Sequence, residues 1–315
     1  MLVKTTPSTP QPQTASAPGA LPPPSSAFGL RPSDFGLRTL AAFTLLELLM
    51  VIAIMGILAA IALPTIRGLK PNAKAAATRD LLYAVGRARQ LALSQRTPVY
   101  MVFLSTNFWT DPSYKYTSWT NTDQYAATGL LDKQLLSYAF VCLRSVGDQP
   151  GVHHPRYLSS WRTLPQGAYI SQEKFTPFNP ASPVPVLKIL TNGVLAYQVF
   201  GFNYTTAVPF PSETTPPASA ARPYIALPYI AFDGMGQLVR EVSGQLGNYQ
   251  LSSLPELIPV SEGNVTYARD AISKKPLPQS PLVTERPPGN TLDNYSLVYI
   301  DRLTGRAHVE RRKVQ

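Results

Sequence analysis

The chain has 315 residues, of which 44% are apolar and only 15% are charged. This apolar content excludes a wholly disordered chain, and 32 prolines favour loops and extended segments over a helical bundle. The net charge of +10 suits anionic partners or membrane surfaces, whereas one cysteine and three histidines exclude a disulfide framework and the usual metal sites, so we expect no metal and no cofactor.

Residues 1–42 are a low-complexity segment that we predict to be a disordered leader. The segment has eight prolines among Ser, Thr, Ala and Gln and few branched aliphatic residues. It cannot bury enough apolar surface to offset the entropy lost on ordering. Its net charge is +2, so removing it would leave +8 on the rest of the chain.

An uninterrupted apolar run, FTLLELLMVIAIMGILAAIAL, follows over Phe43–Leu63 and carries a single charge, Glu47. A helix of this length spans roughly 30 Å, which matches the hydrocarbon core of a bilayer. The run has no polar face, and Pro64 closes it. We therefore predict a membrane-spanning helix rather than a buried core helix.

The run has two membrane interpretations. A secretory signal would use Ala60–Ala62 as a small-residue cleavage site, although such signals have apolar regions of only about 7–15 residues. In the other interpretation Glu47 is the informative residue, because a carboxylate inside a membrane span costs a few kcal/mol and indicates function. The secretory-signal interpretation does not explain why a carboxylate lies within the apolar run.

The partner of Glu47 has to be something other than a basic side chain, since no Lys, Arg or His lies between Arg38 and Arg67. Cleavage between Ala42 and Phe43 would create an α-ammonium group one helical turn from Glu47. That group could meet Glu47 of the same chain or of a neighbouring chain, and a carboxylate also suits a helix start. Charge neutralisation between subunits would hold packed helices in a fixed register.

The sequence Ala42-Phe43-Thr44-Leu45-Leu46-Glu47, followed by the apolar run and Pro64, resembles the class III signal of type IV prepilins and type II secretion pseudopilins. The resemblance implies cytoplasmic cleavage by the prepilin peptidase and N-methylation of Phe43. It further implies an inner-membrane anchor and assembly with other pilin or pseudopilin subunits through helix packing, to which Thr44, Leu45, Leu46, Glu47 and Pro64 would contribute. The implied protein is a structural subunit and not an enzyme.

Two features depart from the family pattern. Ala42 stands where the family nearly always has glycine, which predicts slower cleavage, and a 42-residue leader is long, so we expect either a misassigned start or a genuine cytoplasmic extension. Basic residues are also more numerous after the run than before it, which by itself favours a cytoplasmic C-terminus. Large domains translocate regardless of flanking charge, so we expect a periplasmic C-terminal domain.

An amphipathic periplasmic helix is predicted over residues 65–97. Apolar residues recur every three or four positions, Pro71 should kink the helix, and Thr97-Pro98 should end it. The apolar stripe comprises Ile66, Leu69, Ala73, Ala77, Leu81, Ala84, Ala88 and Leu91. Arg67, Lys74, Arg89 and Arg96 lie on a different side, which we interpret as a solvated face.

Strand-like patterns follow the helix, and we predict a β-rich globular domain with loop insertions over residues 98–315. The predicted strands are Val99–Leu104, Tyr138–Leu143, Val186–Leu190, Val194–Phe200, Tyr229–Phe232, Gln237–Val242, Ser296–Ile300 and Ala307–Glu310. Pro209–Pro223 and Pro276–Asn290 are predicted as long surface loops, and residues 105–225 look inserted. Together with the helix over 43–64, the predicted fold class is α+β, with a long N-terminal helix packed on an antiparallel sheet.

Three local segments are similar to the GspH/FimT class of minor pseudopilins. Arg87–Leu93 with Val99–Phe103 resembles the helix end and first strand of that class. Ile230–Gly236 resembles its glycine-containing hairpin, and Tyr299–Val309 resembles its closing hairpin. This resemblance implies a minor pilin or pseudopilin.

DNA capture during uptake is an alternative function that the FimT branch implies. Its basis here is the +8 charge and a C-terminal cluster of basic residues. The candidate DNA-binding residues are Arg302, Arg306, His308, Arg311, Arg312 and Lys313. The branch uses Gly-Arg-x-Arg, whereas here His308 replaces the second arginine, and no aromatic platform for single strands is evident.

A membrane-anchored enzyme is a remote third hypothesis. His153-His154 is the only histidine pair, and neighbours on an extended chain point in opposite directions. Neither the HExxH nor the Gly-x-Ser-x-Gly motif occurs in the sequence. A catalytic triad of Asp148, His154 and a serine could be drawn, but these residues are not part of a catalytic motif. Cys142 lies among apolar residues and is predicted to be a buried strand residue, not a nucleophile.

Overall fold

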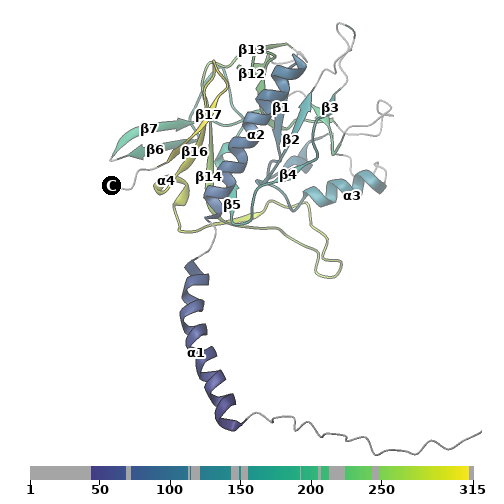
Figure 1. Cartoon of the computed structure of the whole chain (residues 1–315). Helices are drawn as coiled ribbons and strands as arrows, with labels where there is room; N and C mark the ends of the chain where they lie inside the picture. The colour runs from purple at the N-terminus through teal and green to yellow at the C-terminus, as the bar shows by residue number, and fades with distance from the viewer. Residues whose placement is uncertain are drawn as a thin grey trace, which may run out of the picture. The chain divides into compact units, whose positions relative to one another are not determined.

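The computed structural model divides into two compact units, Met1–Gly68 and Leu69–Gln315 (Figure 1). It describes residues 44–68, 72–112, 114, 121–142, 149, 155–191, 193–204, 207–212, 224–242 and 248–311, without the side chains of 59–68. The predicted leader, residues 1–42, lies outside the described residues.

Helix α1 (Leu45–Gly68) is the described part of the first unit. It continues through Pro64 to Gly68, although a proline removes one backbone hydrogen bond. Phe43 and the side chains of residues 59–63, which belong to the predicted membrane span, lie outside the described residues. Within the described residues, no helix combines the length and apolar character that a membrane span requires.

Helix α2 (Ala73–Gln95) begins the second unit. Asn72 caps it, because its side-chain oxygen accepts a hydrogen bond of 2.9 Å from the backbone N–H of Ala75. Arg96 ends it in a left-handed conformation (φ 52°), directly before Thr97-Pro98. The described chain thus has two helices where one over 65–97 was predicted, and Pro71 lies outside the described residues.

The main sheet has eight strands, all paired antiparallel in the order β13-β12-β11-β1-β2-β3, with β4 also beside β2 and β8 beside β11. Its strands are β1 (Val99–Phe103), β2 (Ser137–Cys142), β3 (Arg156–Tyr157), β4 (Arg162–Thr163), β8 (Asn203–Tyr204), β11 (Pro228–Phe232), β12 (Leu238–Glu241) and β13 (Tyr249–Leu251).

A second antiparallel sheet has five strands in the order β15-β14-β16-β17, with β5 also beside β14. Its strands are β5 (Ala168–Ile170), β14 (Glu256–Thr266), β15 (Leu282–Glu285), β16 (Ser296–Ile300) and β17 (Ala307–Arg311). Two ribbons complete the strands: β6 (Leu187–Thr191) with β7 (Val194–Val199), and β9 (Val208–Pro209) with β10 (Tyr224–Ile225). The short helical segments are η1 (Phe108–Thr110), α3 (Asn121–Leu130), η3 (Gln172–Phe175) and α4 (Asn290–Asp293).

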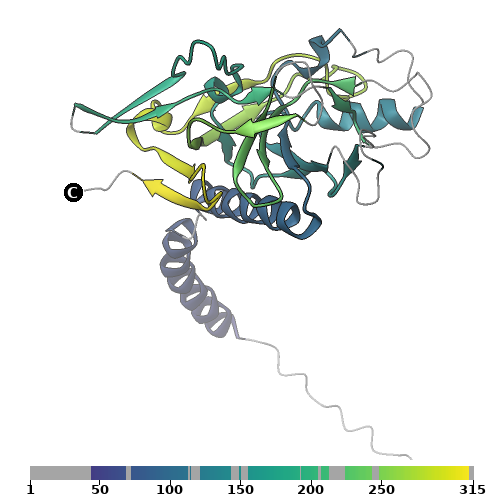
Figure 2. The same cartoon turned by 90° about the horizontal axis from the view of Figure 1, so that it is seen from above.

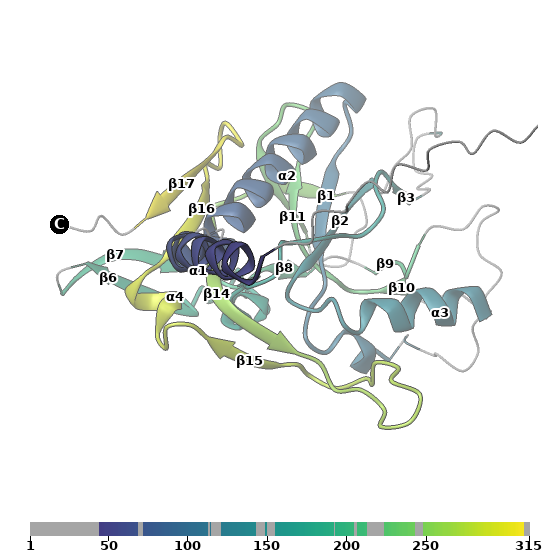
Figure 3. The ribbon, with the colours of Figure 1, turned by 60° about the horizontal axis from the view of Figure 1, so that its bottom comes forward.

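The main core lies where α2 covers both large sheets (Figure 2). Leu81 and Val85 of α2 are fully buried with Met101 of β1 and Ile258 of β14. The other face of the main sheet carries a second core under α3, where Tyr100 and Val102 of β1 meet Leu130. Both faces of β1 are therefore covered, with α2 and α3 on opposite sides (Figure 3).

A third core lies under the β6–β7 ribbon, on the second sheet. Ile189 and Val199 of the ribbon pack there with Leu257 and Leu297. Each sheet is thus buried on two faces, which confirms the α+β class with antiparallel sheets and a helix packed on them.

All eight predicted strands are present, with ends shifted by at most two residues. The prediction of Pro276–Asn290 as a loop is wrong, because this segment contains β15, which pairs with β14. The 11-residue β14 was not predicted. The middle of the chain is not a separate insertion either, since β2 pairs with β1 and β5 pairs with β14.

The solvated-face interpretation of the basic residues on α2 is wrong for Lys74. Lys74 is only 7% exposed, and its Nζ donates to Asn290 Oδ1 (2.9 Å) and to the carbonyl of Asn294. Burial lowers the pKa of Lys74. Arg89 Nε donates to the carbonyl of Thr304 at 2.8 Å. Both side chains tie α2 to distant segments, whereas Arg96 is exposed and the Arg67 side chain lies outside the described residues.

The turns after β11 and β16 meet at the C-terminal part of α2. Leu238 N–H donates to the Arg302 carbonyl at 3.0 Å, which joins the two turns. Gly305 has a left-handed φ of 60°, and a Cβ there would collide with the carbonyl oxygen of Gly236. The two sheets therefore approach so closely at this point that only glycine fits.

We expect Gly305→Ala to lower the free energy of unfolding by about 2–3 kcal/mol, because it adds a backbone clash to an unfavourable φ. Gly193→Ala is the matched control, since Gly193 also has positive φ (77°) but open space around it, and it should lose about 1 kcal/mol. Urea unfolding of the detergent-solubilised chain, followed by tryptophan fluorescence, measures both losses. If both variants lose the same free energy of unfolding, the close approach of the two turns does not contribute to the loss in Gly305→Ala.

Candidate functional site

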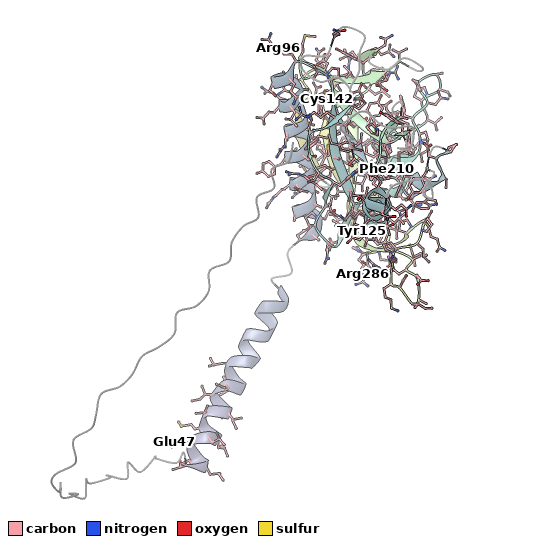
Figure 4. All side chains as sticks on the ribbon, turned by 90° about the vertical axis from the view of Figure 1, so that its right-hand side faces the viewer. Glu47, Arg96, Tyr125, Cys142, Phe210 and Arg286 are labelled. Atoms are coloured by element: carbon pink, nitrogen blue, oxygen red, sulfur yellow. The ribbon has the colours of Figure 1, made fainter. Side chains whose placement is uncertain are left out.

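The first turn of α1 is closed by reciprocal hydrogen bonds between Thr44 and Glu47. Glu47 N–H donates to Thr44 Oγ1 at 3.2 Å, while Thr44 N–H and Thr44 Oγ1 each donate to Glu47 Oε2 at 3.3 Å. This is a capping box, in which a threonine and the glutamate three residues later satisfy backbone N–H groups at a helix start. Figure 4 labels Glu47 on α1.

The capping role of Glu47 was missed in the sequence analysis, although the spacing T-x-x-E before an apolar run signals it. Glu47 is exposed, and its Oε1 accepts no hydrogen bond from the described residues. The cap and an ion pair with an ammonium group are therefore compatible, because they use different oxygens of one carboxylate.

Apolar side chains cover α1 on all sides and are exposed. Described exposed side chains are Leu45, Leu46, Leu48, Leu49, Met50, Val51, Ile52, Ile54, Met55, Ile57 and Leu58. Leu45 is 82% exposed and Leu46 76%. A helix that is apolar all round is stable only when lipid or other helices cover it, so this surface requires a partner.

The structure places the described residues of the C-terminal basic cluster at opposite ends of one hairpin. Arg302 and Arg306 lie in the turn between β16 and β17, and Arg311 ends β17. His308 Nε2 lies 3.0 Å from Glu310 Oε1, and its ring packs against Tyr299 at 4.8 Å between centroids. Arg312 and Lys313 lie outside the described residues.

Glu310 changes the electrostatics of this cluster. Glu310 contacts the His308 ring nitrogen and also accepts a hydrogen bond from Tyr197. Burial, followed by this hydrogen bond, raises the pKa of Tyr197 to about 12. The strand alternation places His308 and Glu310 on the face of β17 opposite to Ala307, which packs against the α2 core. A carboxylate beside His308 opposes phosphate binding there.

Of the residues considered for catalysis, Cys142 is buried in β2, as predicted, and its Sγ lies 3.2 Å from Thr97 Oγ1. Asp148, His153 and His154 lie outside the described residues. In the described part of the chain, no group of three or more His, Cys, Asp or Glu side chains could hold a metal ion.

Comparison with known proteins identifies the N-terminal site. Residues 38–63 match the prokaryotic N-terminal methylation motif, and this range includes the Thr44–Glu47 capping box and the whole apolar run. The chain therefore carries a type IV prepilin-like class III signal, and this signal supports a prepilin-like pilin or pseudopilin. No curated protein and no solved structure matches the chain.

Proposed function

We propose that the chain is a minor pilin or pseudopilin that assembles through α1 into a type IV pilus or a type II secretion pseudopilus. The prepilin peptidase would cut between Ala42 and Phe43 and methylate the new N-terminus of Phe43. The observation that carries the proposal is the Thr44–Glu47 capping box at the head of an exposed, fully apolar helix within the methylation motif.

The apolar surface of α1 suits two environments that this helix would occupy in succession, first the membrane and then the filament. Before assembly, Phe43–Leu63 would span the inner membrane, with the leader cytoplasmic and the β-rich domain periplasmic. In the filament, other subunits would replace lipid around Leu45, Leu46 and the following apolar residues. Both environments are apolar, so the transfer costs little hydrophobic free energy.

In that filament, Glu47 would fix the register between the packed α1 helices of neighbouring subunits. A carboxylate among apolar helices is costly unless it is paired, and the N-terminal ammonium of Phe43 is a cation that cleavage itself would create. Since the cap uses only Oε2, Oε1 can accept the ammonium group of a neighbouring subunit. Each added subunit would then be placed by one ion pair.

Two hairpins support the narrower assignment to the GspH/FimT class. Ala231 pairs with Val239 across the β11–β12 hairpin, and Tyr299 pairs with His308 across the β16–β17 hairpin. Both hairpins coincide with the segments Ile230–Gly236 and Tyr299–Val309 that resemble this class. Their contact through Leu238 and Arg302 makes them one unit at the end of α2.

N-terminal sequencing and intact mass of the membrane-extracted protein, produced together with its peptidase, test the proposal. We expect a chain that begins at Phe43 with the added mass of one methyl group. A chain that begins at Leu63 would show a secretory signal instead. Retention of Met1 in assembled filaments would refute the cleavage mechanism.

A further inference from the structure

A cleft of about 560 Å³ lies at the end of the main sheet, on the side away from α2. Its walls are the last turns of α3, the loop that joins β3 to β4, and Pro211-Ser212. In Figure 4 the neighbouring residues Tyr125 and Phe210 lie on the opposite side of the second unit from α2. The volume is within the range of about 300–1,000 Å³ that is usual for small-ligand sites.

Two aromatic side chains form the apolar part of the cleft, and their polar ends are already bound. Trp161 Nε1 donates to the Pro211 carbonyl at 2.9 Å, and Tyr157 OH donates to the Pro209 carbonyl at 2.8 Å. The buried ring of Phe210 packs edge-on to Trp161 at 6.2 Å. The rings are thus held in place, and what they offer a ligand is apolar ring surface.

The polar part of the cleft is a lysine and three serines. Lys133 and Ser160 make no side-chain hydrogen bond or ion pair with other described residues. Ser159 Oγ accepts from the Phe140 N–H at 3.1 Å and keeps its own O–H to donate, and Ser212 also lines the cleft. Among the described residues, no acidic side chain lines the cleft. The adjacent Asp132 is paired with Arg269 at 2.7 Å, so it does not neutralise Lys133.

We propose that this cleft binds an acidic saccharide. A sugar ring has an apolar C–H face that suits the rings of Trp161 and Tyr157, and its hydroxyl groups suit the serines. A carboxylate on the sugar would meet the Lys133 ammonium group in a partly desolvated site. A single-stranded nucleic acid fits less well, because its backbone needs several cations along a groove, and Lys133 is the one cation among the described residues that line this cleft.

Calorimetric titration of the detergent-solubilised full chain with digalacturonic acid tests the proposal. We expect saturable binding that is at least tenfold weaker for the neutral galactose disaccharide. Lys133→Gln should reduce the affinity for the acid to that for the neutral sugar. Trp161→Phe, which keeps a ring but loses surface and the bond to Pro211, should weaken both sugars alike.

Lys188→Gln is the matched control, since Lys188 is exposed on β6, on the ribbon far from α3 (Figure 1), and this variant should bind normally. The proposal is overturned by an absence of saturable binding at millimolar sugar or by equal losses in the Lys133 and Lys188 variants. It is also overturned if triglutamate or a short oligonucleotide binds more tightly than the acidic sugar. Thermal unfolding of each variant separates lost binding from lost folding.

Discussion

A Glu47→Ala variant is expected to be cleaved and methylated at Phe43 like the wild type but to be absent from filaments. In the proposed mechanism the peptidase would act on a single membrane-inserted chain, whereas assembly would need the carboxylate to pair with the ammonium group of another subunit. Without Glu47 the ammonium remains unpaired in an apolar environment, at a cost of several kcal/mol per subunit. Immunoblots of sheared filaments and of membranes measure incorporation and processing in the same cells.

Two further variants separate the charge of Glu47 from its capping role. Thr44→Ala removes the cap at a cost of about 1 kcal/mol but leaves the carboxylate, so this variant should still assemble. Glu47→Gln keeps an oxygen that can accept the N–H of Thr44 but removes the charge, so it should fail. Assembly of the glutamine variant at the wild-type level would contradict the ion-pair mechanism.

Lys174→Met is expected to destabilise the second unit by about 3–5 kcal/mol. Lys174 is 1% exposed; its ammonium group pairs with Glu256, donates to the Phe200 carbonyl at 2.7 Å and lies 4.6 Å from the centre of the Phe202 ring. Burial lowers the pKa of Lys174 and raises that of Glu256. The substitution would leave the carboxylate of Glu256 buried without its cation, which is the source of the loss.

The double variant Lys174→Met/Glu256→Leu should recover most of this stability, because it leaves neither charge buried. Lys188→Met on exposed β6 is the control and should change stability by less than about 0.5 kcal/mol. Urea unfolding of the full chain in detergent measures all three variants. If the double variant is as unstable as the single one, packing of the lysine stem and not its charge holds η3 against β14.

Strands and helices could be predicted best where one local rule governs a segment. A run such as VYMVF is apolar and mostly β-branched or aromatic, and it forms a strand that is buried on both faces. β14 was missed because Pro259, Gly263 and two glutamates interrupt its pattern. Its length is supported by partners from three distant segments, since β5, β15 and β16 all pair with it.

Buried charges were the other features that sequence reasoning could not find. Lys74 was assigned to a solvated face because helical spacing placed it with arginines, yet its acceptors come from Asn290 and Asn294. Glu310 was never considered beside His308, although two residues on one strand face are neighbours. The cleft lined by Trp161 and Lys133 also joins segments far apart in the chain.

The sequence by itself determined the N-terminal signal, because cleavage, capping and membrane insertion depend on residues within about one helix length of each other. It also determined the position of most strands, since local patterns decide which residues are extended. Only the tertiary structure decided which charges are buried, how the two sheets share α2 and where a cleft opens. Those properties depend on contacts between residues more than 50 positions apart, such as Lys174 with Glu256, and no local pattern encodes them.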